Sequence, residues 1–321
     1  MEFGFALPNG GPLAKPEIIA QLAARGEALG FSAFAISDHI VFPADIASRY
    51  PYSPDGTYSN PQNSGGAVLE PLALLAFIAA VTKKAKLITS VLVVPYRHPV
   101  LAAKLLSTVD VLSNGRVVAG IGTGWMAEEF PPVGAPPFEE RGKVTDEYIA
   151  VYRELWSKPK PSFKGKYADV KGILFEPKPV QKGGIPIWVG GESTPALRRA
   201  GRLGDAWYPI GCNPHYPMDT LARFEAGAKA VRGFAEEAGR KPSDVALTYW
   251  AVWQGGGKRA KANDGGAMLF TGGADDIAAD IAAFRRLGVS TLMFNFYRGE
   301  LQQTLDSMAW FADEVLPKLK G

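Results

Sequence analysis

The chain is poor in the residues that build metal sites and crosslinks. It has one cysteine, Cys212, and three histidines in 321 residues. A single cysteine excludes an internal disulfide and a cysteine-based metal site, and it is typical of proteins in the reducing cytoplasm. His39, His98 and His215 lack the H-x-x-x-H spacing of a metal-binding helix, and no clear carboxylate set accompanies them. The sequence therefore predicts a cytoplasmic protein without a metal centre.

An excess of charge and a long apolar run are also missing. Lys and Arg number 35 against 32 Asp and Glu, so the chain lacks the basic stripe that nucleic-acid binding requires. The N-terminus carries Glu2 and has the pattern of a strand, unlike a secretory signal. The longest apolar helical stretch, 71–81, is far shorter than the roughly 20 residues of a membrane span. We expect neither nucleic acid nor a membrane as a partner, and without a G-x-S-x-G motif a hydrolase of that design is unsupported.

Strand-like and helix-like segments alternate along the whole chain. Strands are predicted over 2–7, 31–37, within 86–99, and over 116–122, 185–189, 206–210, 245–252 and 291–296, and a helix is predicted after each. Eight such units favour an α/β fold, a single (β/α)8 TIM barrel over residues 1–321 with its sites at the carboxyl ends of the strands. The competing architecture is an open doubly wound sheet with GIGTG at 120–124 as a dinucleotide motif. That motif lacks its third glycine and occurs in the fourth unit.

Two long segments interrupt the regular pattern. Residues 41–70 contain several prolines and aromatic residues, and residues 254–266 are rich in glycine and lysine. Loops of this length in a compact chain are typical of lids and binding walls. We expect both at the carboxyl-end face of the barrel, as walls of a substrate site.

Polar residues follow the second and third strands. Asp38 and His39 stand where the strand 31–37 ends, and a histidine there is a candidate general base or proton donor. The alternative is a histidine that hydrogen-bonds a neighbouring loop. Thr89 and Ser90 interrupt the apolar run 87–94, so their hydroxyls either satisfy backbone groups of neighbouring strands or face a ligand.

The fourth strand ends in a second polar cluster. Trp125 follows the glycine-rich strand end at Gly122, so it is a candidate wall of the substrate pocket or a side chain that fills the barrel mouth. Glu128 and Glu129 either orient a substrate or complement the dipole of a helix start.

The fifth strand runs into a turn with two glycines and two hydroxyls. Gly190, Gly191, Ser193 and Thr194 precede a predicted helix, where freed backbone amides would receive a phosphate well. The alternative is an ordinary helix cap before Pro195. Glu192 would repel an anion if its side chain pointed inward.

Several long blocks carry a family resemblance. They are ISDHI at 36–40, the run from Thr89 to Phe130, the run from Phe175 to Pro209, and GVSTLMF before the last helix. Together they resemble the bacterial luciferase-like monooxygenase family, and within it a group of oxidoreductases that depend on a deazaflavin, coenzyme F420. The resemblance covers most of the chain. It implies a (β/α)8 barrel with a flavin-type ring bound in the carboxyl-end mouth.

The resemblance also implies roles for single residues. A non-proline cis peptide between Ser90 and Val91 would bulge toward the ring. The cofactor-binding residues would be Asp38, Ser90, Val91, Gly122, Gly190, Gly191 and Ser193, with the last three at the phosphates. His39 would be the catalytic residue. Relatives that oxidise glucose 6-phosphate have a tryptophan and a glutamate where this chain has Pro43 and Trp125, which argues against that substrate.

Two mechanisms agree with such a site. In the first, F420 exchanges a hydride with a small-molecule substrate while His39 donates or accepts the proton. In the second, a two-component monooxygenase uses oxygen and reduced FMN delivered by a separate reductase. A non-catalytic, flavin-binding barrel is the alternative from another class. The resemblance further implies a homodimer.

Overall fold

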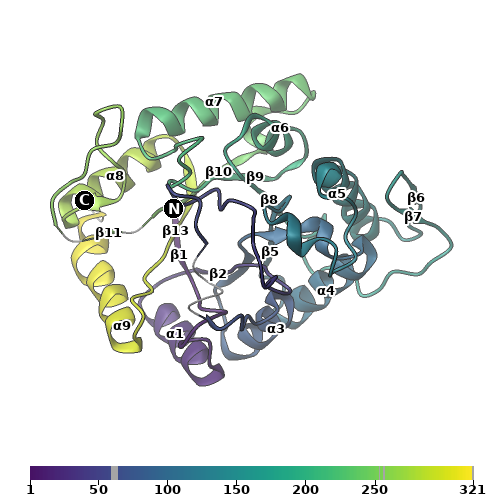
Figure 1. Cartoon of the computed structure of the whole chain (residues 1–321), viewed down its shortest axis with the longest axis horizontal. Helices are drawn as coiled ribbons and strands as arrows, with labels where there is room; N and C mark the ends of the chain where they lie inside the picture. Colours follow the sequence, from purple (N-terminus) through teal and green to yellow (C-terminus); the bar gives the residue numbers. More distant parts are fainter. Residues whose placement is uncertain (59–63, 253, 256, 320–321) are drawn as a thin grey trace.

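The protein forms a closed barrel of parallel strands surrounded by helices, in a computed structural model that describes residues 1–58, 64–252, 254–255 and 257–319 (Figure 1). The barrel strands are β1 (Glu2–Ala6), β2 (Ala33–Ile36), β3 (Lys86–Thr89) with β4 (Leu92–Val93), β5 (Val117–Gly122), β8 (Ile187–Gly190), β9 (Ala206–Tyr208), β10 (Ala246–Trp250) and β13 (Val289–Phe294). Each predicted strand is present, within two or three residues of its predicted ends.

The pairing of the strands closes the sheet. Going round the barrel, the order is β3, β2, β1, β13, β10, β9, β8, β5, and β5 pairs with both β3 and β4. All of these pairs are parallel. The (β/α)8 barrel is therefore confirmed, and the open doubly wound sheet is wrong because β3 and β5 join its two edges.

The described helices form a ring outside the barrel. They are α1 (Pro16–Ala28), α3 (Pro71–Val81), α4 (Pro99–Leu112), α5 (Arg141–Ser157), α6 (Thr194–Leu203), α7 (Leu221–Glu237), α8 (Ala274–Arg286) and α9 (Leu301–Trp310). None of them is both long enough and apolar enough to cross a lipid bilayer. Between α5 and β8, the antiparallel pair β6 (Phe163–Lys164) and β7 (Asp169–Val170) extends away from the barrel (Figure 1).

Two predicted helices have different ends. The helix predicted from 218 begins at Leu221, because the side chain of Thr220 accepts a hydrogen bond from the amide of Arg223 and caps it. The last helix, predicted over 301–319, is α-helical only to Trp310. A π-helical turn and a 3₁₀ turn follow over 311–319, where Pro317 has no N–H to continue the α-helical pattern.

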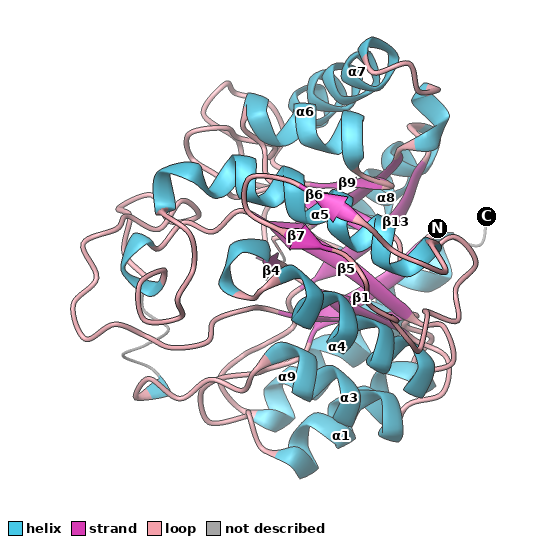
Figure 2. Cartoon of the chain, turned by 90° about the vertical axis from the view of Figure 1, so that its right-hand side faces the viewer, coloured by secondary structure: helices cyan, strands magenta, loops and turns pink. Residues whose placement is uncertain are grey.

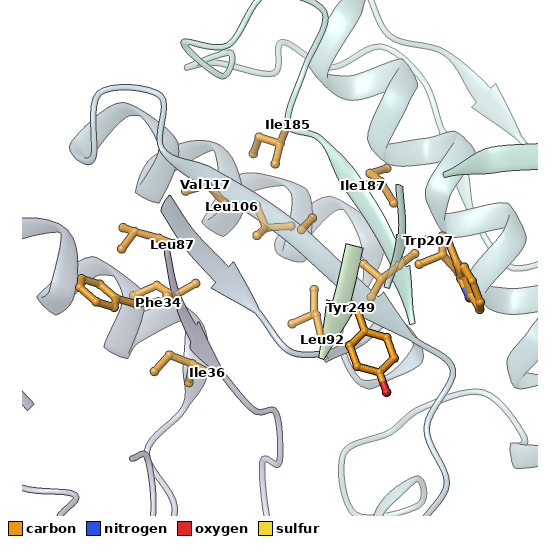
Figure 3. Close-up of a cluster of buried hydrophobic side chains, with 14 of the residues drawn as sticks. Phe34, Ile36, Leu87, Leu92, Leu106, Val117, Ile185, Ile187, Trp207 and Tyr249 are labelled. Carbon is orange, nitrogen blue, oxygen red and sulfur yellow. The ribbon is translucent and has the colours of Figure 1, made fainter. Parts of the chain in front are cut away.

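The alternation of side chains along each strand builds two cores. On β2, Phe34 and Ile36 belong to the large cluster between barrel and helices, part of which Figure 3 shows, while Ala33 and Ala35 belong to a smaller cluster inside the barrel. The interior is narrow. A Cβ at Gly4 of β1 would lie 2.6 Å from the sulfur of Met293 on the neighbouring strand β13, so a large interior side chain is matched by a small residue beside it.

The loops that follow the carboxyl ends of the strands gather at one end of the barrel, which we call the barrel mouth. Figure 2 shows these long loops at one end and both chain termini toward the other (Figure 2). The residues singled out after β2, β3, β5 and β8 all follow strand ends on the mouth side, as a parallel barrel requires.

Candidate functional site

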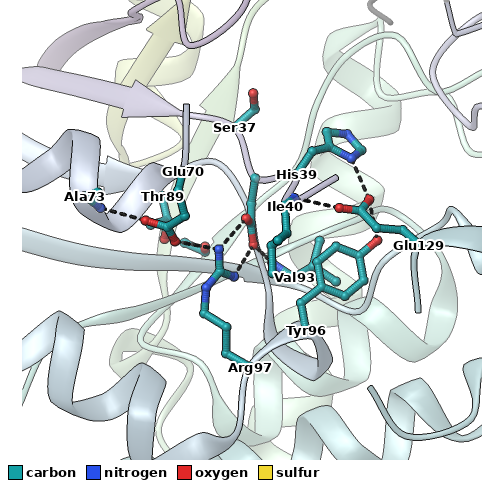
Figure 4. A network of polar contacts seen from close by, with 12 residues as sticks. Ser37, His39, Ile40, Glu70, Ala73, Thr89, Val93, Tyr96, Arg97 and Glu129 are labelled. Atoms are coloured by element: carbon teal, nitrogen blue, oxygen red, sulfur yellow. Dashed lines mark hydrogen bonds and ion pairs between the residues drawn. The ribbon is translucent and has the colours of Figure 1, made fainter. Parts of the chain in front are cut away.

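His39 is held in the barrel mouth by a buried carboxylate. Its Nδ1 lies 2.8 Å from Oε2 of Glu129, which follows β5, and only 7% of the His39 side chain is exposed (Figure 4). Glu129 itself is fully buried. Because Nδ1 is taken up by this contact, Nε2 is the ring nitrogen that remains for a ligand.

Glu129 accepts three hydrogen bonds in addition to its contact with His39. Its Oε1 accepts from the backbone amides of Ile40 at 2.6 Å and Val41 at 3.2 Å. Its Oε2 accepts from the hydroxyl of Tyr96 at 2.9 Å, in addition to the contact with His39. Burial, and then the charge of Glu129, raises the pKa of Tyr96 well above its usual value, so this hydroxyl keeps its proton and donates. The carboxylate thus joins the loop after β2 to the ends of β4 and β5.

Asp38 forms a second buried ion pair beside the first. Its two oxygens accept from Nη1 and Nη2 of Arg97, both at 2.8 Å, and Oδ2 also accepts from the amide of Val93 at 2.8 Å. Arg97 reaches Glu70 at 2.7 Å, and Glu70 caps α3 through the amide of Ala73. Burial alone would lower the pKa of Arg97, but Asp38 and Glu70 outweigh it and raise that pKa. A contact between Asp38 and a cofactor stays a prediction, since its oxygens face protein donors.

Aromatic rings lie close to the imidazole of His39. Phe42 lies 4.9 Å from the imidazole and Trp125 lies 6.3 Å from it, measured between ring centroids. Tyr50 and Tyr58 each lie 5.1 Å from Trp125. Burial raises the pKa of Tyr50, so this phenol is uncharged near neutral pH. Trp125, which follows β5, thus packs against His39 and against Tyr50 and Tyr58 of the loop after β2, and its role as a substrate wall stays a prediction.

The loop after β2 is tied to the end of β5. Oε1 of Glu128 accepts from the amides of Ala47 and Ser48, both at 2.9 Å, and the Ser48 hydroxyl accepts from the amide of Ala127 at 3.0 Å. The predicted loop 41–70 lies partly outside the described residues, at 59–63. In its described part it covers the mouth, as the dark trace across the barrel in Figure 1 shows. Glu128 and Glu129 therefore both bind the loop after β2, so complementing a helix dipole does not account for either of them.

The loop predicted over 254–266 also lies partly outside the described residues, at 256. Its described part is held to helices by ion pairs: Arg259 contacts Asp280 of α8, and Arg223 of α7 contacts Asp264. Among the described residues of the chain, no group of three or more His, Cys, Asp or Glu side chains is arranged to hold a metal ion.

The third barrel strand is interrupted where the resemblance implies a bulge. The peptide bond between Ser90 and Val91 is cis, as expected, and it separates β3 from β4. The Thr89 hydroxyl donates to the backbone oxygen of Gly120 on β5 at 2.7 Å. Of the two possibilities for this hydroxyl, it therefore satisfies a backbone group of a neighbouring strand. Ser90 instead meets the hydroxyl of Tyr208 at 3.2 Å.

Val91 occupies space that two glycines leave open. A Cβ at Gly122 would lie 2.7 Å from Cγ2 of Val91, and a Cβ at Gly190 would lie 3.0 Å from its Cγ1. The three predicted cofactor-binding positions Val91, Gly122 and Gly190 are therefore in contact. Their contact with a cofactor stays a prediction.

The turn after β8 leads into α6 without a side-chain cap. Ser193 occupies the N-cap position, yet its side chain makes no capping hydrogen bond, so the ordinary-cap alternative does not account for this serine. Gly191 has φ +105°, and a Cβ there would lie 2.9 Å from that of Ala196. The turn therefore needs glycine, and the first amides of α6 are not served by the Ser193 side chain.

The carboxylate of Glu192 is bound to the segment after β9. Its Oε1 accepts from the amide of Ile210 and its Oε2 from the side-chain amide of Asn213, both at 2.8 Å. It is buried, and burial raises its pKa to about 7. The repulsion that Glu192 would cause at an anion site is thus reduced in two ways, by the donors that its two oxygens contact and by its tendency to hold a proton.

The family follows from a match over most of the chain. The sequence profile of the luciferase-like monooxygenase family matches residues 1–264. The chain belongs to this family. It is therefore an enzyme of the luciferase-like oxidoreductase and monooxygenase class.

Relatives within the luciferase-like family differ in their named activities. An uncharacterized protein of Mycobacterium tuberculosis, Rv0940c, is 37% identical over 219 residues, which are 68% of this chain and 72% of that protein. The F420-dependent glucose-6-phosphate dehydrogenase of Amycolatopsis mediterranei is 29% identical over 242 residues, 73% of this chain and 66% of that protein. The crystal structure of the monooxygenase RslO1 from Streptomyces bottropensis shares the fold, with a TM-score of 0.74, 19% identity and 99% coverage of both chains.

The sequence did not predict the buried contacts that hold His39 and Asp38 in the luciferase-like site. It treated Glu129 only as one of two acids after a strand, and it gave Arg97 and Tyr96 no role. Asp38 and Arg97 are 59 residues apart, and His39 and Glu129 are 90 apart. One signal was available: Arg97 ends the segment after β4, on the same side of a parallel barrel as Asp38.

Proposed function

We propose that the protein is an oxidoreductase that binds the deazaflavin coenzyme F420 in the barrel mouth and transfers a hydride to or from a small organic substrate. The observation that carries this proposal is the imidazole of His39, buried beneath aromatic rings with Nδ1 fixed on Glu129. A histidine held in this way leaves one nitrogen to exchange a proton with a substrate.

The residues at the mouth fit such a cofactor. The start of α6 offers backbone amides and the Ser193 hydroxyl, which makes no cap bond, and both are suited to a phosphate. Gly190 and Gly191 add no side chain of their own beside that helix start, and both oxygens of Glu192 are bound to Ile210 and Asn213. We propose that this turn holds the phosphate side of the cofactor, and that Ser90, Val91 and Gly122 lie against its ring.

The cofactor, His39 and the aromatic residues would have different roles in the reaction. The bound cofactor supplies the hydride chemistry. Nε2 of His39 holds the proton that the substrate gains or loses. Phe42, Tyr50 and Trp125 exclude water from that nitrogen and offer an uncharged, flat surface for the organic part of the substrate.

F420 is preferred over FMN because of the sequence relatives. The F420-dependent dehydrogenase is similar over 242 residues, and the matched blocks of this chain resemble the deazaflavin group most. The second candidate is a two-component monooxygenase that uses reduced FMN and oxygen, which the family's description favours. Trp125 and Pro43 argue against glucose 6-phosphate as the substrate in either case.

A binding experiment distinguishes the two cofactors. Purified protein is titrated separately with F420 and with FMN, each oxidised and reduced, and binding is followed by fluorescence and calorimetry. We expect tight binding of F420 and weak binding of FMN. Submicromolar affinity for FMN with none for F420 would overturn the first choice and support the monooxygenase.

A substitution tests the role of His39. The His39→Ala variant should bind the cofactor with little change but lose turnover by about 100-fold or more, since a positioned acid or base contributes that much. His98→Ala is the matched control, because His98 is exposed at the N-cap of α4 and its side chain makes no capping hydrogen bond. Unchanged turnover in His39→Ala would remove this residue from the mechanism, and cofactor binding without turnover in the wild type would favour the non-catalytic barrel.

A further inference from the structure

We propose that Glu129 is a positioning residue that fixes the tautomer of His39, with the proton on Nδ1 and the lone pair on Nε2. This inference rests on the proposed function for its catalytic meaning, but its structural part does not need a cofactor. It goes beyond the candidate role of His39 because it names the residue that decides which nitrogen can accept a proton.

Two of the groups that contact Glu129 can act only as hydrogen-bond donors. Ile40 and Val41 present backbone N–H groups to Oε1 of Glu129, at 2.6 and 3.2 Å. A backbone N–H can only donate, so Oε1 must act as an acceptor. This end of the carboxylate is fixed by the main chain of the loop that carries His39 itself.

The other oxygen meets two groups that can change roles. The Tyr96 hydroxyl donates to Oε2 at 2.9 Å, and the distance of 2.8 Å between Oε2 and Nδ1 of His39 allows either nitrogen role. Carboxylic acids are stronger acids than imidazolium ions, so a proton shared by the two groups rests on the imidazole. Nδ1 therefore carries the proton, and in the neutral ring Nε2 is an acceptor.

This tautomer suits one direction of the proposed chemistry. For an alcohol substrate, a bound oxidised deazaflavin would supply the hydride acceptor for the carbon, and the hydroxyl proton would pass to Nε2 of His39. The O–H bond breaks, an N–H bond forms, and the carbon–oxygen bond becomes a carbonyl. The imidazolium formed is then paired with the buried carboxylate of Glu129. The reverse direction returns the same proton from Nε2 to the carbonyl oxygen.

Replacing Glu129 by glutamine should reverse the tautomer. Glutamine has one acceptor oxygen and one NH2 group, and the two backbone amides force the oxygen to take the place of Oε1. The NH2 group then faces Nδ1 of His39 and the Tyr96 hydroxyl. Nδ1 must become the acceptor, so the neutral ring carries its proton on Nε2 and can no longer take one from a substrate.

Nuclear magnetic resonance reads this directly in the protein without cofactor. The chain has three histidines, so a ¹⁵N-histidine-labelled sample gives few signals, and His39→Asn identifies those of His39. At about pH 9, where an imidazole is ordinarily neutral, we expect Nδ1 protonated and Nε2 unprotonated in the wild type. We expect the opposite in Glu129→Gln.

A neighbouring acid provides the matched control. Glu128→Gln makes the same change of charge one residue away, where the carboxylate contacts Ala47 and Ser48 instead of His39. It should leave the His39 nitrogen signals unchanged. In activity, Glu129→Gln should lower kcat for alcohol oxidation by about 100-fold with little change in KM.

Two results would overturn the proposal. One is a wild-type spectrum with the proton on Nε2, which tests the proposal even if Glu129→Gln does not fold. The other is an unchanged His39 tautomer in a folded Glu129→Gln variant. If the tautomers are as expected but no deazaflavin binds, the proposed function fails while the positioning role of Glu129 stands.

Discussion

The two sides of the barrel mouth are built in opposite ways. On the side of β2, β4 and β5, buried charges are matched with donors, as in the contacts of Asp38 with Arg97 and of Glu129 with His39. On the side of β8 and α6, glycines form the turn and the Ser193 side chain does not cap the helix start. The first side fixes side chains before any ligand arrives, and the second offers main chain to one.

The largest loss of stability is expected from removing a buried ion pair on the side of β2, β4 and β5, which we call the matched side. Arg97→Leu leaves the carboxylate of Asp38 buried with only the Val93 amide as a partner, and an uncompensated buried charge costs about 3 to 5 kcal/mol of unfolding free energy. Chemical denaturation measures the loss. Lys86→Met is the control, because the Lys86–Glu2 pair is partly exposed and worth less than about 1 kcal/mol. Equal losses in both variants would contradict the comparison.

A pH-dependent effect of the next size should come from Glu192. Its pKa is raised by burial from 4.5 to about 7 in the folded protein, so the folded state holds this proton more tightly than the unfolded state. Stability from this group is fully present below about pH 4.5 and is lost as the pH rises through 7, by up to about 3 kcal/mol.

Unfolding free energies measured from pH 5 to pH 8 test this loss, with Glu192→Gln as the comparison. The variant has no proton to lose at this position, so its stability should fall less over the same range. Parallel pH curves for the two proteins would show that Glu192 does not titrate as described.

A smaller loss of stability is expected from adding a side chain on the side of β8 and α6, which we call the open side. Gly191→Ala adds a Cβ that would lie 2.9 Å from Ala196, at a φ of +105° that side chains rarely adopt. We expect a cost of about 1 to 3 kcal/mol and a weaker affinity for the proposed cofactor. Gly233→Ala is the control, because a Cβ there meets nothing within 4 Å. Unchanged cofactor affinity in a folded Gly191→Ala protein would separate this turn from the binding site.

The smallest effect on stability should come from Ser193. Because its side chain makes no cap hydrogen bond, Ser193→Ala should cost only a few tenths of a kcal/mol, whereas Thr220→Ala, which removes the observed cap of α7, should cost about 1 kcal/mol. Cofactor titration then distinguishes the two residues, since Ser193→Ala should weaken binding of the cofactor. A loss of stability as large as that of Thr220→Ala would mean that Ser193 is an ordinary cap.

Local sequence patterns predicted the barrel and the turn after β8, but they did not predict the ion pairs after β2 and β5. The barrel follows from local patterns of strand and helix, and the turn at 190–194 is a continuous motif whose glycines and hydroxyls can be read together. The ion pairs of the matched side join residues far apart in the chain, so no local pattern reports them. Asp38 illustrates this limit, because its neighbour His39 is visible in the sequence but its partner Arg97 belongs to another strand end.

The side chain of Val91 limits which substitutions this site can accept. Its two methyl groups fill the spaces that side chains at Gly122 and Gly190 would need, so the three positions share one fixed volume. A larger residue at Gly122 becomes acceptable only after Val91 has become smaller, and the order of such substitutions therefore matters. Variants with Val91→Ala and Gly122→Ala should be more stable together than the sum of their separate effects allows.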